Sequence, residues 1–292
     1  MTEIQFGVNL RAVTSRQDLR EWAGRADELG YDVLAAPDHL GGVAPFTVLA
    51  AAAMVSTRLR LRSYVLNVGF WNPALLAREV ATLDALSDGR VELGLGAGHM
   101  KAEHDDAGLP WLPFEQRVRA LEDTLIEVRR RLADESHQPQ PVQRPVPVMV
   151  AAMSRQALTV AARHAELIGF AGLRQVKGAP LGTLTICSAA ELTERVELVR
   201  EQADGRPYRS DILLQAVVIG PDPERAAAEW AAKLLGVTVA QVLDTPFALF
   251  AEDAERAADE LRRRQKAFGL DSISTHRPNM EALGEVIAGY RG

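Results

Sequence analysis

The chain has 292 residues, a formal net charge of −6 and 47% hydrophobic residues. This content suffices for one barrel-sized core or two smaller ones, and the negative balance argues against a nucleic-acid or anionic-membrane surface. A single cysteine, Cys187, excludes an intrachain disulfide framework and a cysteine-rich metal site. Because no leader-like N-terminus and no apolar run long enough for a bilayer are present, we expect a cytoplasmic α/β protein.

Short apolar runs alternate with amphipathic helical patterns along the whole chain. Runs such as 146–150 and 212–219 are almost continuously apolar, which is typical of parallel strands covered on both faces. Eight strand–helix units predict a (β/α)8 TIM barrel as a single domain over 1–292, and the unit count disfavours an open doubly wound sheet. The candidate strands begin near Ile4, Asp32, Leu59, Arg90, Val146, Leu167, Ile212 and Ser272.

Two stretches fit this repeat poorly, at about 99–113 and 172–188. Both follow strands, so we expect them as insertions at the C-terminal face of the barrel, where active sites form. The segment 136–147 contains four prolines and precedes a strand. We therefore expect a stiff connector on the opposite face.

The segment 82–98 is the most informative part of the sequence. It reads as a helix end, an Asp-Gly turn, a buried strand, and a strand exit with Gly94, Gly96 and Gly98. These glycines remove every second side chain, which would let a flat ring or a phosphate approach the backbone closely. The spacing differs from the Gly-x-Gly-x-x-Gly dinucleotide fingerprint because the third glycine comes one residue early.

A histidine stands at the end of the second strand run, in Asp38-His39, with two glycines shortly after it. In this position it can donate a hydrogen bond to a ligand and titrate near neutrality. The alternative is that Asp38 caps a turn and His39 merely packs. At the exit of the third strand, Phe70 and Trp71 either line a pocket or lie under a loop.

A small-residue segment after the fifth strand, Ala151-Ala152-Met153-Ser154-Arg155, opens a helix. Small residues, a serine and an arginine at a helix N-terminus are typical of a phosphate cradle. Ser154 is also an ordinary N-cap, and the two roles are compatible.

Two other chemistries find little support. His99, Glu103 and His104 resemble metal ligands, but the sequence has no His-Glu-x-x-His arrangement and no evident third ligand, so we expect no metal. It also has no Gly-x-Ser-x-Gly elbow to present a serine nucleophile.

With these motifs together, the chain resembles the bacterial luciferase-like superfamily, and within it the branch that uses the deazaflavin coenzyme F420. The resemblance covers nearly the whole chain and is strongest over 72–103. It rests on Leu83-Asp84-x-Leu86-Ser87-x-Gly89-Arg90, on Gly94-x-Gly96-x-Gly98 followed by Glu103, and on Asp38-His39, Ala151-Ala152 and Gly289-Tyr290-Arg291.

The resemblance implies an isoalloxazine-like ring at the C-terminal mouth of the barrel. It also implies a non-proline cis peptide bond on the third strand, which alignment on Asn72-Pro73 places at Ser63-Tyr64. The implied cofactor-binding residues are Asp38, His39, Ser63, Tyr64, Gly96, Ala97, Gly98, Ala152, Met153, Ser154 and Arg155.

Three residues depart from the family pattern. His99 follows Gly98 where some sugar-oxidising relatives carry an acidic residue, so their substrate and mechanism do not transfer directly. Asn67 stands where relatives often have proline, and Met153 replaces a glycine that is common in the phosphate loop.

From the resemblance we expect hydride transfer at C5 of the deazaflavin, with His39 and His99 as candidate catalytic acids or bases. Phe70, Trp71 and Trp111 would form an apolar substrate wall. The missing acidic residue favours reduction of an activated C=C or C=N bond, for example in a natural-product precursor. The alternatives are an FMNH2-dependent monooxygenase and a non-catalytic flavin-binding barrel.

We further expect a small-molecule substrate and a homodimer formed through the second and third helices, where the alanines at 50–53 offer a small-residue surface. Arg174 and Lys177 would attract the anionic tail of the cofactor or form a lid, unless they belong to a solvated loop.

Overall fold

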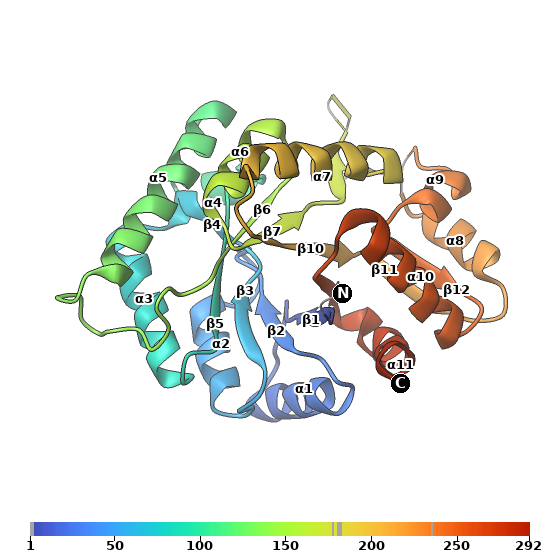
Figure 1. The fold of residues 1–292 in the computed structure, drawn as a ribbon, viewed down its shortest axis with the longest axis horizontal. Helices are drawn as coiled ribbons and strands as arrows, with labels where there is room; N and C mark the ends of the chain where they lie inside the picture. Colours follow the sequence, from blue (N-terminus) through green and yellow to red (C-terminus); the bar gives the residue numbers. More distant parts are fainter. Residues whose placement is uncertain (1–2, 177, 180–182, 235) are drawn as a thin grey trace.

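A parallel sheet closes on itself as a TIM barrel in the computed structural model, which describes residues 3–176, 178–179, 183–234 and 236–292 (Figure 1). The sheet order is β3-β2-β1-β13-β10-β7-β6-β5-β4, and pairing of β3 with β5 completes the barrel. This confirms the predicted fold. The strands are β1 (Gln5–Asn9), β2 (Val33–Ala36), β3 (Arg60–Ser63), its continuation β4 (Leu66–Asn67), β5 (Val91–Gly96), β6 (Val148–Ala152), β7 (Leu167–Phe170), β10 (Arg209–Leu214) and β13 (Ser272–His276).

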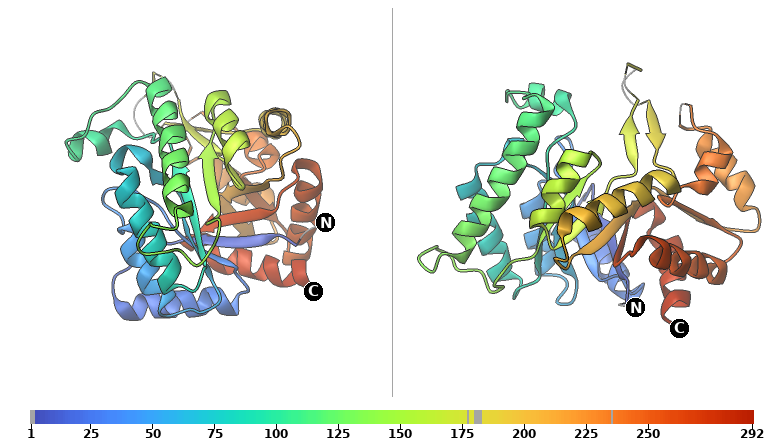
Figure 2. Two further views of the ribbon diagram at one scale, coloured as in Figure 1. Left: turned by 60° about the vertical axis from the view of Figure 1, so that its left-hand side comes forward. Right: turned by 45° about the horizontal axis from the view of Figure 1, so that its top comes forward.

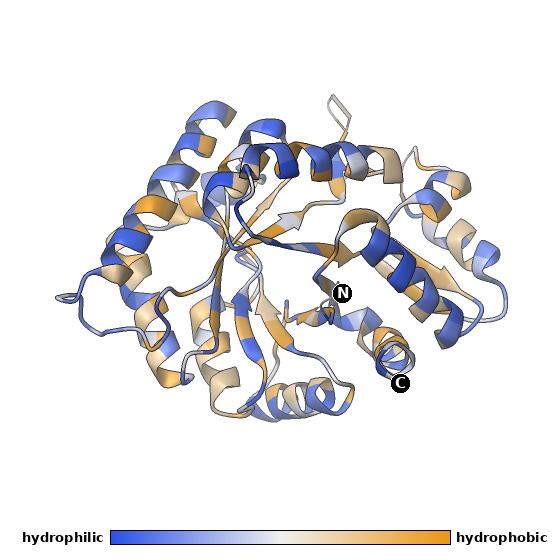
Figure 3. Ribbon diagram, in the orientation of Figure 1, coloured by the Kyte–Doolittle hydropathy of each residue, from blue (hydrophilic) through white to orange (hydrophobic). Residues whose placement is uncertain are grey.

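Helices follow the barrel strands and surround them (Figure 1). Figure 3 shows long hydrophobic stretches on the strands and a largely hydrophilic outer surface on α10. The outer layer comprises α1 (Arg16–Glu28), α2 (Pro45–Ala53), α3 (Pro73–Leu86), α5 (Phe114–Ala133), α6 (Arg155–His164), α7 (Ala189–Ala203), α10 (Ala254–Phe268) and α11 (Met280–Arg291), with 3-10 turns η1 (Val68–Phe70) and η2 (Arg277–Asn279).

Local sequence explains these helices. In α3, Pro73 occupies the first turn and Asn72 Oδ1 accepts a hydrogen bond from the Ala74 backbone N–H at 2.9 Å. In α5, buried Leu121, Leu125 and neighbouring apolar residues recur at three- and four-residue steps, so one face packs on the sheet. Of the described residues, no helix combines the length and apolar character that crossing a membrane requires.

Two insertions extend the C-terminal face. The stretch 99–113 contains the short helix α4 (Lys101–Asp106). The stretch 172–188 contains an antiparallel hairpin, β8 (Leu173–Gln175) and β9 (Leu184–Ile186), which projects away from the barrel in the right-hand view of Figure 2. Lys177 lies outside the described residues.

A third insertion was not predicted. The apolar run 212–219 is not one strand: β10 ends at Leu214, and after Gln215 the chain continues as β11 (Ala216–Ile219). This strand leaves the barrel and pairs in parallel with β12 (Ala248–Ala251), and between them lie α8 (Pro223–Ala231) and α9 (Val239–Asp244). Ala227, Ala231 and Val242 give this side sheet a small apolar cluster of its own.

Charged side chains pack against one another inside the barrel. Arg62 of β3 is fully buried, and its guanidinium contacts Glu92 Oε2 at 2.6 Å and Asp211 Oδ1 at 3.3 Å. Burial raises the pKa of Glu92, but Arg62, Arg60 and Arg209 outweigh burial and lower that pKa to about 2. These contacts join β3, β5 and β10 across the barrel interior.

Candidate functional site at the barrel mouth

The carboxyl ends of the barrel strands bring the predicted polar residues to one rim. Asp38 and His39 follow β2, Gly98 and His99 follow β5, and Ser154 follows β6. The order of strands places β2 two positions from β5, with the bulge between β3 and β4 between them. Residues far apart in the sequence therefore meet at this edge.

Asp38 ties two rim loops together. Its Oδ2 accepts hydrogen bonds from the Asn67 backbone N–H at 3.1 Å and from Trp71 Nε1 at 2.8 Å. Burial raises the pKa of Asp38, and these two hydrogen bonds oppose the rise. The ring of Trp71 also packs edge-on against Phe46, with centroids 5.2 Å apart. Asp38 thus fixes the position of Trp71 rather than capping its own turn.

His39 forms a hydrogen-bonded pair with Glu103 of α4. His39 Nδ1 lies 2.8 Å from Glu103 Oε1, and the two side chains are 28% and 11% exposed. An ionised carboxylate only accepts hydrogen bonds, so Nδ1–H of His39 donates to Glu103 and Nε2 is the ring nitrogen left for another partner. The sequence did not identify this partner, although Glu103 was visible four residues after His99.

The structure brings His99 against His39. The two rings meet edge to face with centroids 5.4 Å apart. Burial lowers the pKa of His99, a protonated His39 and the Arg117 guanidinium would each lower it further, and the Glu103 carboxylate opposes this effect. At neutral pH the His99 ring is therefore uncharged.

Phe70 and Trp111 pack around a buried histidine. His104 is 2% exposed, and its ring centroid lies 5.0 Å from each aromatic ring. His104 Nε2 is 2.9 Å from Asn67 Nδ2, and its Nδ1 is 3.1 Å from the Pro110 carbonyl oxygen. For Phe70, this arrangement is that of the alternative in which the side chain lies under a loop; Trp111, predicted as part of the substrate wall, packs against the same histidine.

Arg117 of α5 is a further rim residue that the sequence did not reveal. Its guanidinium stacks 3.8 Å from the Trp111 ring. It also donates hydrogen bonds to the carbonyl oxygens of Ala97, at 3.4 Å, and Gly98. Arg117 therefore fixes the backbone that leads into His99.

The glycines after β5 accommodate the chain's own backbone. A Cβ on Gly94 would lie 1.9 Å from the Ser63 carbonyl oxygen, and one on Gly96 would lie 2.8 Å from a Val65 methyl. Gly98 has a φ of +73° and would meet Asn67 Oδ1 at 2.5 Å. The space that the glycine spacing predicted for a ligand is thus occupied by the bulge between β3 and β4.

This bulge contains the non-proline cis peptide bond, at Tyr64–Val65. The prediction of Ser63–Tyr64 was wrong by one residue. Ser63 Oγ accepts from the Gly94 N–H at 2.8 Å, and Tyr64 Oη donates to Asp211 Oδ2 at 2.5 Å. Both side chains are committed to protein contacts, and the Tyr64 backbone N–H donates to the Ala36 carbonyl oxygen at 2.8 Å, so neither side chain is offered to a ligand.

The predicted phosphate loop begins α6. Ser154 Oγ accepts a hydrogen bond from the Ala157 backbone N–H at 3.2 Å, as an N-cap does. Arg155 is exposed and forms no ion pair among the described residues. Ala152 and Met153 precede them at the end of β6. In the second insertion, Arg174 is instead paired with Glu191 at 3.0 Å.

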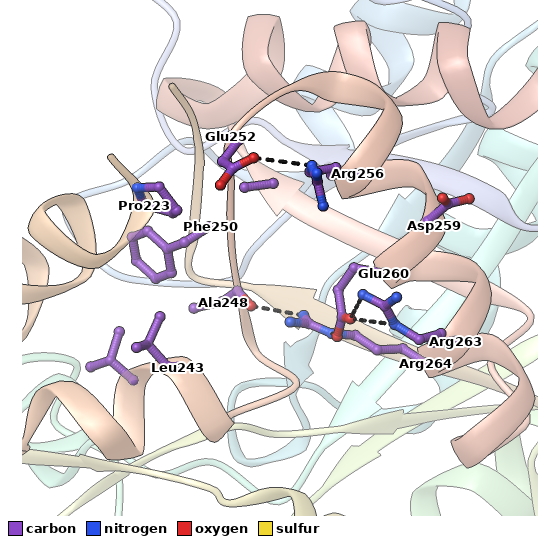
Figure 4. Close-up of a pocket in the computed structure, with 12 residues that line it drawn as sticks. Pro223, Leu243, Ala248, Phe250, Glu252, Arg256, Asp259, Glu260, Arg263 and Arg264 are labelled. Carbon is purple, nitrogen blue, oxygen red and sulfur yellow. Dashed lines mark hydrogen bonds and ion pairs between the residues drawn. The ribbon is translucent and has the colours of Figure 1, made fainter. Parts of the chain in front are cut away.

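A hollow of about 360 Å³ lies away from the mouth, between β12, α9 and α10 (Figure 4). Its arginines are paired with carboxylates: Arg256 contacts Glu252 at 3.0 Å, and Arg263 and Arg264 each contact Glu260 at 2.7 Å. Charges are balanced there, so the mouth is the stronger candidate site. Within the described residues, no group of three or more His, Cys, Asp or Glu side chains is placed to hold a metal ion.

Comparison with known proteins agrees with this architecture. The family model described as luciferase-like monooxygenase matches residues 1–281, so the chain belongs to this family. It is 35% identical over 122 residues to an F420-dependent glucose-6-phosphate dehydrogenase of Amycolatopsis mediterranei, a match covering 39% of this chain and 37% of that enzyme.

Two further relatives differ in the cofactor that they are named for. An FMNH(2)-dependent dimethylsulfone monooxygenase of Pseudomonas putida is 26% identical over 204 residues, covering 65% of this chain and 52% of that enzyme. A solved F420-dependent secondary alcohol dehydrogenase, in complex with an F420–acetone adduct, superposes with a TM-score of 0.77 at 16% identity and full coverage of both chains. The aligned parts cover less than two thirds of the length of these two sequence relatives. The similarity to the solved structure, at 16% identity, shows a shared fold.

The residues at the mouth fit a phosphorylated redox cofactor. The start of α6 offers free N–H groups beside Ser154 and the unpaired Arg155, which is the donor set that a phosphate requires. Apart from this donor set, Asn9 Oδ1 and His276 Nδ1 are buried at the ends of β1 and β13, with no hydrogen-bond partner among the described residues. A polar molecule in the mouth would satisfy such atoms.

Proposed function

We propose that this protein is an F420-dependent oxidoreductase that transfers a hydride between C5 of the deazaflavin and a small organic substrate. When bound, the deazaflavin supplies a carbon that accepts or releases the hydride. The observation that carries the proposal is the grouping of His39, Glu103 and His99 at the rim. His99 follows β5, which pairs with β6, the strand before the helix start at Arg155. The relatives named for F420 support the choice of cofactor.

In this proposal the chain contributes orientation and proton handling. Arg155, Ser154 and the start of α6 hold the phosphate of the cofactor. His39 Nε2 takes a proton from the substrate or returns one, and Glu103 stabilises the imidazolium that forms. The neutral His99 offers a second polar group beside it. The insertion that carries Glu103 and Trp111 excludes water from the mouth.

The direction of transfer is also part of the proposal. From the resemblance, His99 stands where some sugar-oxidising relatives carry an acidic residue, and burial lowers its pKa so that the ring is uncharged at pH 7. We therefore favour reduction of an activated C=C or C=N bond by the reduced cofactor. A screen of unsaturated carbonyl compounds and imines with F420H2 tests this direction: reduction of the substrate should raise the absorbance of oxidised F420, and no rise with any compound would contradict it.

The FMNH2-dependent monooxygenase is the second candidate, supported by the relative from Pseudomonas putida. Titration of the purified protein with F420 and separately with FMN, followed by fluorescence quenching, separates the candidates. Saturable quenching of F420 at micromolar concentration is expected. Tight binding of FMN with no response to F420 would favour the monooxygenase, and binding of neither would refute both.

We also propose a homodimer through α2 and α3. Met54, Leu75 and Leu86 on these helices are 75%, 51% and 57% exposed. An adjacent hollow of about 310 Å³ between α1 and α2 is lined by apolar residues such as Val43 and Val48. Exposed apolar surface of this kind favours association. Sedimentation that gives only monomer at micromolar concentration would refute the dimer.

A further inference from the structure

Two polar side chains at the ends of neighbouring strands lack partners. Asn9 is the last residue of β1 and 2% exposed, and its Oδ1 accepts no hydrogen bond from any described residue. His276 is the last residue of β13, and its buried Nδ1 likewise has no described partner. In the parallel register, Asn9 lies opposite His276. Asn9 Oδ1 and His276 Nδ1, both without a described partner, therefore lie on neighbouring strand ends at the mouth.

Strand alternation shows that both side chains face the barrel interior. Ser272 and Ser274 donate hydrogen bonds to Asp211 Oδ1, and Asp211 contacts Arg62 from the opposite side of the barrel. His276 follows Ser274 by two residues and so shares its face. Gly7 lies opposite Ser274, and a Cβ on it would meet Ser274 Oγ at 2.8 Å, so Asn9, two residues on, also points inward.

Leaving such groups unpaired has an energetic cost that a ligand can recover. A buried polar atom without a partner loses its hydrogen bonds to water and gains nothing in return. Burial lowers the pKa of His276 to about 4, and nearby Arg11 contributes in the same direction. At neutral pH both side chains are therefore uncharged. Such a pair suits a neutral group that both donates and accepts hydrogen bonds.

The closed order of strands places this pair relative to the proposed cofactor. Around the barrel, β13 is diametrically opposite β5, and β1 is opposite β6. Asn9 and His276 thus stand across the mouth from Gly98 and Arg155, on the side that a cofactor held by the latter leaves open. The loop with His39 follows β2, which pairs with β1.

We propose that Asn9 and His276 form the polar recognition site of the substrate and select a neutral amide or hydroxyl group. Asn9 Oδ1 accepts a hydrogen bond from the N–H or O–H of that group. His276, protonated at Nδ1, donates a hydrogen bond to the oxygen of the same group. The inference rests on the proposed function and adds its substrate class. A molecule lacking the polar group leaves both atoms unpaired, so it is bound poorly.

The test uses the intact protein and three small probes. Acetamide donates and accepts, 2-butanone only accepts, and acetate is an anion. Imidazole 15N shifts are recorded for the six histidines, and His276→Gln assigns the His276 signals. Acetamide should shift the His276 signals saturably, more strongly than either other probe, and Asn9→Leu should abolish that shift. A stronger response to acetate, or no response to any probe, would overturn the proposal.

Stability and cofactor binding complete the test. Because Leu has nearly the shape of Asn but no unpaired oxygen, Asn9→Leu should raise Tm by about 2 °C or more. A fall in Tm would show that Asn9 is satisfied within the folded protein, for example by a bound water, and would overturn the proposal. Asn9→Leu should leave F420 quenching unchanged. F420 quenching without an acetamide response refutes this inference alone, whereas an acetamide response without F420 quenching refutes the proposed function alone.

Discussion

The substitution Gly94→Ala should destabilise the barrel strongly. A Cβ at this position would lie 1.9 Å from the Ser63 carbonyl oxygen, and ordinary contact begins at 3.4 Å. The two strands would have to separate by about 1.5 Å, because a backbone oxygen cannot rotate away. Separation would also strain the hydrogen bonds between the Ser63 hydroxyl and the backbone of Gly94. We expect a loss of about 3–5 kcal/mol in the free energy of unfolding.

Urea unfolding followed by circular dichroism measures this loss. Gly24→Ala is the matched control, because a Cβ at Gly24 in helix α1 would meet nothing within 4 Å. It should stabilise the protein by about 1 kcal/mol through helix propensity. If Gly94→Ala instead unfolds within about 1 kcal/mol of the unsubstituted protein and only F420 quenching is lost, the glycine serves the ligand and our reasoning is wrong.

Three further predictions concern the mouth. Glu103→Gln replaces a charge-assisted hydrogen bond to His39 with a neutral one, which should lower kcat/KM by about tenfold in F420H2 turnover; an unchanged rate would remove Glu103 from the mechanism. Arg155→Ala should weaken F420 binding by about tenfold in the quenching titration, whereas Arg163→Ala at the far end of the same helix should not. Because the pKa of His276 is about 4 in the folded protein and 6.5 for an unperturbed histidine, unfolding takes up a proton between these values, and stability should fall as pH drops from 6.5 to 4. His276→Gln should flatten the pH dependence of urea unfolding in that window, and an undiminished slope would show that other groups cause it.

The barrel was predictable because parallel strands buried on both faces leave long apolar runs that local sequence reveals. The same apolar pattern does not reveal the separate sheet formed by β11 and β12. The run 212–219 contains only one polar residue, Gln215, and nothing local shows that the strand changes partner there. Partner choice depends on β12, which lies in a short apolar stretch at 248–251. Tertiary pairing therefore decided where the barrel strand ends.

The site was predictable to the extent that strand ends meet at one rim. The family resemblance made His39 and His99 separate candidates at this rim, and the structure shows their rings in contact. Glu103 depends on the path of an insertion, which strand periodicity does not describe. Asn9 and His276 could have been paired from sequence, because closure sets the last strand beside the first. The glycines are visible in the sequence, but only the folded structure shows that the neighbouring strand fills their space.

The charged interior of the barrel limits how this protein can change over time. Arg62 forms ion pairs with Glu92 and Asp211, and all three side chains are buried. Replacement of one of the three leaves an unpaired charge in an interior of low polarity. This lowers the free energy of unfolding far more than replacement of all three by apolar residues. Viable descendants must therefore replace these positions jointly, so comparison of orthologous sequences should find them covarying as one unit.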